Sequence, residues 1–187
     1  MNPERKVALV VGANGVVGRD TIQHLRDLNE WEIIGVSRRG GTDTGRVRYI
    51  AVDLLDADDP RQKLGGLTEV THIFYAAFQD RPTWAELVPP NLAMLVNSVD
   101  AVEPVAAGLR HVSLMQGYKV YGAHLGPFKT PARESDAGHM PPEFNVDQQS
   151  FLERRSQGKS CTRPSRRSSA CPCDFREGPV PTPASSR

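Results

Sequence analysis

The chain has 187 residues, 39% of them hydrophobic, and its 23 Lys and Arg residues nearly balance its 22 Asp and Glu residues. This length suits one ordinary domain with its own core, and the net charge of +1 excludes a global field that would recruit nucleic acid or an anionic membrane. No apolar run reaches the ~20 residues that cross a bilayer, and the first strand begins too early for a signal peptide, so we expect a cytoplasmic protein.

The first predicted element is a strand over residues 7–11, five apolar residues that are too few for a helix and typical of a buried parallel strand. Gly12, Gly15 and Gly18 follow, and apolar residues at three-residue steps then predict a helix over about 16–28. Gly12 allows a sharp turn, Gly15 allows backbone to approach a pyrophosphate, and Gly18 allows close helix packing. The alternative is a purely structural glycine turn. The cofactor-binding residues expected here are Gly12, Asn14, Gly15, Val16, Val17 and Gly18.

The second predicted strand, residues 31–36, ends in Ser37, Arg38 and Arg39, all three expected to bind the cofactor. In dinucleotide-binding folds an acidic residue near this position holds the ribose 2′-OH of NAD. A charge-assisted hydrogen bond contributes ~1.5–3 kcal/mol, so two arginines here favour a 2′-phosphate and NADP(H) is the expected cofactor. The alternative is that both arginines are ordinary solvated loop residues.

The third and fourth predicted strands, residues 47–52 and 71–77, also end in residues that suit a cofactor. An acidic residue after the third strand either meets the adenine amino group or caps the turn that follows. Two small residues at the end of the fourth strand let a ribose lie against the backbone. The contacts expected here are Asp53, Leu54, Ala76 and Ala77.

A longer helix and a fifth strand complete the pattern. Two prolines followed by Asn91, a good N-cap, predict a helix from that residue to about 105, and residues 109–115 predict a strand. A short helix is expected near Leu64 and Leu67. This order of elements is typical of an α/β Rossmann fold, a doubly wound parallel sheet with ligands at the carboxyl ends of its strands.

Lys119 lies between Tyr118 and Tyr121, directly after the fifth predicted strand. This position is beside the nicotinamide end of a bound cofactor, where a lysine and phenols can stabilise negative charge on a substrate oxygen. Gln116 is expected to contact the cofactor at the same edge. On spacing alone, an ordinary surface lysine beside a glycine turn explains Lys119 equally well.

Several motifs occur in an order known from one family. They cover residues 12–18, 37–39, 52–54, 71–75, 91–95, 114–122, 126–128 and 131–134. From about residue 6 to residue 160 the chain thereby resembles the progesterone 5β-reductase/iridoid synthase-like reductases, which are atypical extended short-chain dehydrogenases/reductases. The resemblance implies NADPH-dependent reduction of an activated C=C bond in a small enone or enal substrate. It also implies that Lys119 is the catalytic lysine that, with a tyrosine, stabilises the enolate oxygen.

The chain departs from this family where the catalytic tyrosine is expected, because Asn145 and Val146 occupy those places. Either Tyr118 or Tyr121 substitutes, or enone reduction is not the reaction. One alternative is a nucleotide-sugar epimerase or dehydratase, which would need a Tyr-x-x-x-Lys pair that residues 145–155 lack. A second is a non-catalytic NADP(H)-binding sensor or scaffold. None of these interpretations excludes a homodimer, in which a second copy of this chain is the protein partner.

The C-terminal residues, 158–187, differ in composition from the rest of the chain. We expect residues 1–157 to form the nucleotide-binding domain and 158–187 to be a disordered tail, since the tail is rich in Pro, Ser and Arg without apolar periodicity. Cys171 and Cys173 have no second ligand pair, so no metal site is expected. Our hypothesis is that the tail is out-of-frame translation and that the chain is truncated, lacking the C-terminal substrate lobe.

Overall fold

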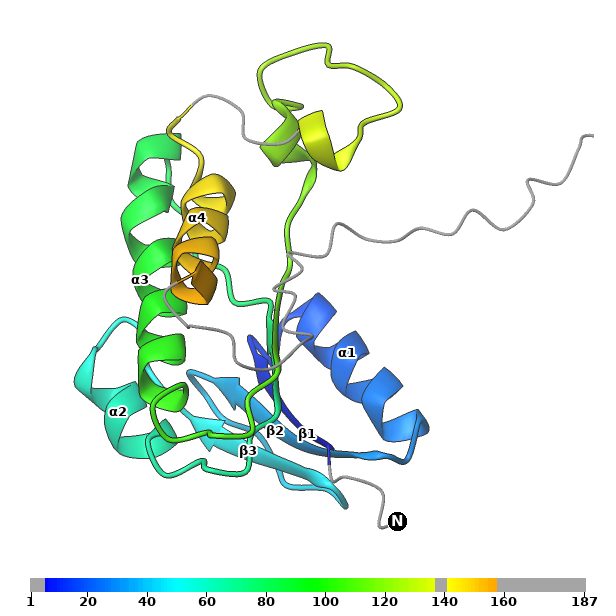
Figure 1. Cartoon of the computed structure of the whole chain (residues 1–187), viewed down its shortest axis with the longest axis vertical. Coiled ribbons are helices and arrows are strands. Elements are labelled where there is room, and N and C mark those ends of the chain that lie inside the picture. The colour runs from blue at the N-terminus through cyan, green and yellow to red at the C-terminus, as the bar shows by residue number, and fades with distance from the viewer. Residues whose placement is uncertain (1–5, 137–140, 158–187) are drawn as a thin grey trace, which may run out of the picture.

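The computed structural model describes residues 6–136 and 141–157 and shows a parallel sheet with helices on both faces (Figure 1). The predicted tail lies outside the described residues. The elements are β1 (Lys6–Val11), α1 (Val16–Asp27), β2 (Trp31–Ser37), β3 (Val47–Ala51), α2 (Asp58–Leu64), β4 (His72–Tyr75), α3 (Trp84–Val102), β5 (His111–Leu114), η1 (Tyr118–Tyr121), η2 (Glu134–Asp136) and α4 (Phe144–Gln157).

The sheet has five strands in the order β3-β2-β1-β4-β5, and every neighbouring pair is parallel. This topology confirms the predicted doubly wound Rossmann fold. Val11 at the end of β1 pairs with Val36 on one side and Tyr75 on the other, so the loops after β1, β2 and β4 leave the sheet at the same edge. Strand order reverses beside β1, and in open α/β sheets ligands bind at such a switch point.

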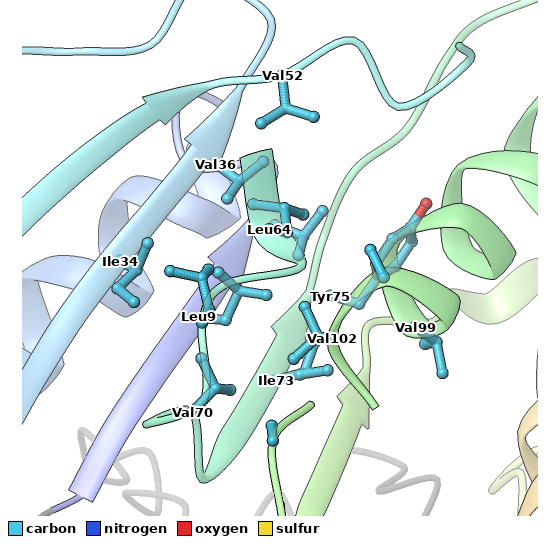
Figure 2. Close-up of a cluster of buried hydrophobic side chains, with 14 of the residues drawn as sticks. Leu9, Ile34, Val36, Val52, Leu64, Val70, Ile73, Tyr75, Val99 and Val102 are labelled. Atoms are coloured by element: carbon cyan, nitrogen blue, oxygen red, sulfur yellow. The ribbon is translucent and has the colours of Figure 1, made fainter. Parts of the chain in front are cut away.

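Alternating side chains of the strands build one core on each face of the sheet. Leu9 and Val11 of β1 face the larger cluster, between the sheet and the helices α2 and α3. Figure 2 shows Leu9 of this cluster together with Ile73 and Val99. Ala8 and Val10 face the smaller cluster under α1, which includes Ile22 and Leu25. Burying one such Leu or Ile contributes ~1.5–3 kcal/mol, so β1, apolar on both faces, anchors the whole sheet.

Helix α3 begins earlier than the sequence indicates. The predicted start at Asn91 is wrong, because the helix begins at Trp84 and runs through Pro89 and Pro90. Its N-cap is Thr83, whose hydroxyl accepts a hydrogen bond from the Glu86 N–H at 3.3 Å. Pro89 and Pro90 are the sixth and seventh residues of the helix, past the first four N–H groups that have no partner within it, so the carbonyls of Ala85 and Glu86 lack their usual helical donors.

Asn91 lies fully buried inside α3 rather than at its end. Its amide nitrogen donates to the carbonyls of Gln79 and Leu87, both at 2.8 Å, and its amide oxygen accepts from the N–H of Gln79 at 2.8 Å. The backbone carbonyl of Asn91 in turn accepts from Nε2 of Gln148 on α4 at 2.8 Å. This residue therefore fixes the loop after β4 and one side of α4 against α3.

Helix α4 packs along α3 (Figure 1). Arg155 donates from Nε to Glu103 at 2.8 Å and from a terminal nitrogen to Asp100 at 2.6 Å, so one guanidinium holds a carboxylate of α3 and that of its C-cap. Phe151 and Leu152 pack against the larger core cluster. None of the helices in the described ranges is both long enough and apolar enough to cross a membrane.

Candidate functional site

The loop after β1 turns sharply because of Gly12, whose φ is +91°. Its N–H and that of Ala13 donate to the Val36 carbonyl at 2.9 and 3.0 Å, which ties the loop to the end of β2. A Cβ on Gly12 would lie 2.7 Å from the carbonyl carbon of Ala76, so a side chain has no room there. The turn role predicted for Gly12 matches this geometry.

The two later glycines sit at the start of α1 in different surroundings. A Cβ on Gly18 would lie 2.2 Å from the Gly12 carbonyl oxygen, so α1 packs directly on the loop at this point. Gly15 is the N-cap, exposed and with ordinary extended dihedral angles, and its Cβ would meet only the Gly12 oxygen at 3.3 Å. The first N–H groups of a helix have no intrahelical partner, so those of Val16 and Val17 and the positive end of the helix face outward beside Gly15.

The residues after β2 form a tight turn next to this loop. The Gly40 N–H donates to the Ser37 carbonyl at 3.2 Å, which leaves Arg38 and Arg39 as its two exposed central residues. Asn14 Nδ2 donates to Ser37 Oγ at 2.8 Å and to the Gly40 carbonyl at 2.8 Å. The glycine loop and the two-arginine turn, both predicted to bind the cofactor, are thus in direct contact.

Asp53 and Leu54 lie just after β3, and both make contacts that stabilise the fold. Asp53 Oδ1 accepts from the Leu55 N–H at 3.1 Å, which is the turn-capping alternative, and its own N–H donates to Asp59 at 2.7 Å. The Lys63 ammonium first, and this Asp53 N–H second, hold the pKa of Asp59 below its ordinary value. The Leu54 side chain is buried in the core, so a cofactor contact is left only to its backbone.

Ala76 and Ala77 continue β4 past its last ladder pair. The Ala76 N–H donates to the Val11 carbonyl at 2.8 Å, and both alanines are half-buried beside Gly12. Tyr75, the residue before them, points into the core instead (Figure 2), and burial raises the pKa of its phenol. The small residues therefore lie at the carboxyl edge, while the phenol is held away from it.

Lys119 lies in η1, where its ammonium sits 4.3 Å from the centre of the Trp84 indole at the start of α3. The His124 ring contacts the same indole, with ring centres 4.3 Å apart. Tyr118 is 69% exposed, and its ring lies 6.4 Å from the half-buried Tyr121. Lys119 and both tyrosines were predicted from the sequence and stay predictions, whereas the contacts of Trp84 with Lys119 and His124 have no local pattern that marks them.

Gln116 joins the fifth strand to α4. Its Nε2 donates to the Asn145 carbonyl at 3.0 Å and to Gln149 at 3.4 Å. The Asn145 amide donates to Oε1 of Glu143 at 2.7 Å, and the Val146 N–H donates to Oε2 at 3.2 Å. Glu143 is only 1% exposed, and these two donors give each of its buried carboxyl oxygens a hydrogen bond at the start of α4. The side-chain amide of Asn145 is therefore committed to Glu143 in this structure.

A model of the NAD dependent epimerase/dehydratase family matches residues 8–143. The chain is 38% identical over 149 residues to a 3-oxo-Δ(4,5)-steroid 5β-reductase of Arabidopsis thaliana. It is 37% identical over 145 residues to the (S)-8-oxocitronellyl enol synthase CYC2 of Camptotheca acuminata. These matches cover 75% and 74% of this chain and 36% of each relative, so the chain spans about a third of their length. They confirm the resemblance predicted from the motifs.

Solved structures share the fold at low sequence identity. A UDP-glucose 4-epimerase of Thermotoga maritima superposes with a TM-score of 0.64 at 16% identity, covering 81% of this chain and 51% of the epimerase. A short-chain dehydrogenase/reductase superfamily protein of Agrobacterium tumefaciens, solved with bound NAD, gives 0.61 at 20% identity, covering 81% of this chain and 45% of that protein. Both likenesses establish the Rossmann architecture alone.

Proposed function

This chain belongs to the NAD dependent epimerase/dehydratase family, and on that premise we propose that it is an NADP(H)-dependent reductase of an activated C=C bond. The observation that carries the cofactor assignment is the contact between a glycine loop at a helix N-terminus and a turn that presents Arg38 and Arg39. The reductase assignment is supported by the two curated relatives, whose names are those of a steroid 5β-reductase and an enol synthase.

The residues present fit a dinucleotide with a 2′-phosphate. Gly15 is exposed and lacks a side chain beside the outward N–H groups of α1, which suits a diphosphate. Arg38 and Arg39 are exposed and carry the fork of donors that matches a phosphate. Ala76 and Ala77 leave the carboxyl edge of β4 shallow enough for a ribose. When bound, NADPH supplies the hydride for the reduction.

Lys119 is the group that we assign to the developing enolate. Its ammonium donates a hydrogen bond to the substrate oxygen as negative charge builds there, and Trp84 holds the lysine at one side of the site. Val146 cannot donate, and Asn145 is hydrogen-bonded to Glu143. Tyr121, two residues past Lys119 in η1, is therefore our first choice for the phenol, with Tyr118 second.

The direct test is a titration with NADPH and NADH, followed by NADPH oxidation with small enones. We expect NADPH to bind at least tenfold more tightly than NADH, and Arg38→Ala/Arg39→Ala to remove most of that preference, since each lost charge-assisted bond is worth ~1.5–3 kcal/mol. Lys119→Ala should bind NADPH normally and lose turnover. Equal affinities for both nucleotides in the unaltered chain would contradict the assignment of the arginines.

Position 146 offers a gain-of-function test. Val146 is half-buried and is tied to Glu143 only through its backbone N–H, so Val146→Tyr can add a phenol without unpairing the buried carboxylate. We expect this variant to raise the rate of enone reduction. Asn145→Tyr is the matched control, because it removes the hydrogen bond to Glu143 and should lower stability instead. A faster Asn145→Tyr and an unchanged Val146→Tyr would reverse the assignment.

A second candidate function is a non-catalytic NADP(H)-binding protein. The specific observation in its favour is that polar groups at the place of the missing tyrosine are bonded within the fold: Gln116 Nε2 donates to the Asn145 carbonyl, and the Asn145 amide donates to Glu143. This candidate predicts the same nucleotide titration but no enone-dependent NADPH oxidation, in the unaltered chain or in Val146→Tyr. Turnover that depends on Lys119 would exclude it.

A further inference from the structure

The loop after β1 and the turn after β2 are connected by one side chain. Asn14 Nδ2 carries two hydrogens, and the structure gives it two acceptors, Ser37 Oγ at 2.8 Å and the Gly40 carbonyl at 2.8 Å. Ser37 Oγ itself donates to the Gly40 carbonyl at 3.1 Å. The amide, the hydroxyl and the carbonyl thus form a closed triangle that spans two loops far apart in sequence.

This triangle closes the base of the two-arginine turn. The Ser37 carbonyl accepts from the Gly40 N–H at 3.2 Å and from the Val52 N–H at 3.0 Å, so the turn is also tied to the residue after β3. Gly40 has a φ of +62°, which favours glycine, and is buried against Ala51. With both ends of the turn fixed, the backbone fixes the points from which the side chains of Arg38 and Arg39 leave the turn.

We propose that Asn14 is a positioning residue for nucleotide specificity, because it holds the two-arginine turn at a fixed place relative to the glycine loop. The inference rests on the proposed function, in which the glycine loop meets the diphosphate and the arginines meet the 2′-phosphate. These two phosphates belong to one ligand with a fixed span, so their two binding loops must keep one separation. The side chain of Asn14 keeps that separation through hydrogen bonds to Ser37 and Gly40, the two residues that flank the arginines.

The experiment measures the dissociation constants of NADPH and NADH for Asn14→Ala and for the unaltered chain. We expect the NADPH preference to fall about tenfold, which is what two intramolecular hydrogen bonds of ordinary strength are worth, while NADH affinity changes by less than about threefold. Ser37→Ala, which removes one of the two acceptors, should give a smaller loss in the same direction. Gln23→Ala, which deletes an exposed amide bonded to Asp27 on α1, is the control and should change neither constant.

A double-mutant cycle separates positioning from direct contact. If Asn14 acts through the arginines, Asn14→Ala has no further effect on NADPH affinity in an Arg38→Ala/Arg39→Ala background. The same full effect in that background would overturn the inference, as would equal losses for NADPH and NADH. Failure of the unaltered chain to bind either nucleotide would instead refute the proposed function, so the two failures are distinguishable.

Discussion

The glycines at the start of α1 allow structural and cofactor roles to be separated by a single methyl group. Gly15→Ala adds a Cβ at an exposed N-cap with ordinary dihedral angles, 3.3 Å from one carbonyl oxygen. Gly18→Ala adds a Cβ 2.2 Å from the Gly12 oxygen and 2.8 Å from its carbonyl carbon. Gly12 has no freedom to withdraw, because it is itself packed against the backbone of Ala76. The same chemical change therefore meets one tight contact, which a shift of a few tenths of an ångström relieves, in one case and an impossible overlap with fixed backbone in the other.

The expected magnitudes differ accordingly. Overpacking at Gly18 costs about 3 kcal/mol, of which about 1 kcal/mol returns through the better helix propensity of alanine. A net loss of about 2 kcal/mol corresponds to a fall in Tm of roughly 4–8 °C for a chain of this size. Gly15→Ala should lose about 1 kcal/mol at the N-cap but at least tenfold in NADPH affinity, because the methyl group keeps a diphosphate from the N–H groups of α1.

Thermal unfolding and an NADPH titration on both variants provide the assay. We expect Gly15→Ala to melt only about 2–4 °C below the unaltered chain and to bind NADPH poorly. We expect Gly18→Ala to melt clearly lower. Unchanged NADPH affinity in Gly15→Ala would show that no diphosphate approaches this backbone and would remove the basis of the cofactor assignment. Unchanged stability in Gly18→Ala would show that α1 can shift to admit a side chain.

Further predictions concern the rest of the fold. Lys119→Met should lower the free energy of unfolding by about 0.5–1 kcal/mol, measured by urea denaturation, because it removes the contact with Trp84. Trp84→Leu should lower the free energy of unfolding less in the Lys119→Met variant than in the unaltered chain. Arg155→Met should cost about 1 kcal/mol at low salt and less at high salt, because its two ion pairs between α4 and α3 are half-exposed. Burial first, and the charges of His111 and Lys6 next, hold the pKa of His72 below its ordinary value, so the unfolded chain binds the proton more readily. Stability should therefore be full above pH ~6.5 and decline as pH falls below it, and His72→Phe should flatten this decline in Tm measured by calorimetry.

The parts of the fold that could be predicted from the sequence are those set by local pattern. Residues 7–11 are apolar on both faces because β1 lies in the middle of the sheet, and this run alone identifies a parallel strand. The turn at Gly12 and the close packing at Gly18 follow from the absence of a Cβ, which the sequence states directly. The expected short helix appears as α2, ending at Leu64.

The misplaced or missed features depend on contacts between distant residues. Pro89 and Pro90 normally end a helix, but the buried hydrogen bonds of Asn91 to Gln79 stabilise α3 around them. Leu54 stands where a cofactor contact is expected, yet its side chain fills the core. Strands β4 and β5 are shorter than their apolar runs, because ladder pairing stops where the loops diverge. None of these outcomes has a local cause that a sequence pattern could contain.

The two ends of the candidate site are held in place by different kinds of contact, so substitutions should affect them differently. At the end that we assign to the diphosphate, backbone groups at the ends of β1, β2 and β4 bond to one another, so few side chains are needed. At the end that we assign to the nicotinamide, the position of η1 depends on the hydrogen bond from Gln116 to α4, and that of α4 depends on the bonds from Arg155 and Gln148 to α3 and its C-cap. Changes at α4 should therefore disturb the placement of Lys119 before they disturb nucleotide binding. The departure from the family at Asn145 falls on this second end, which is why cofactor binding and turnover have to be measured separately.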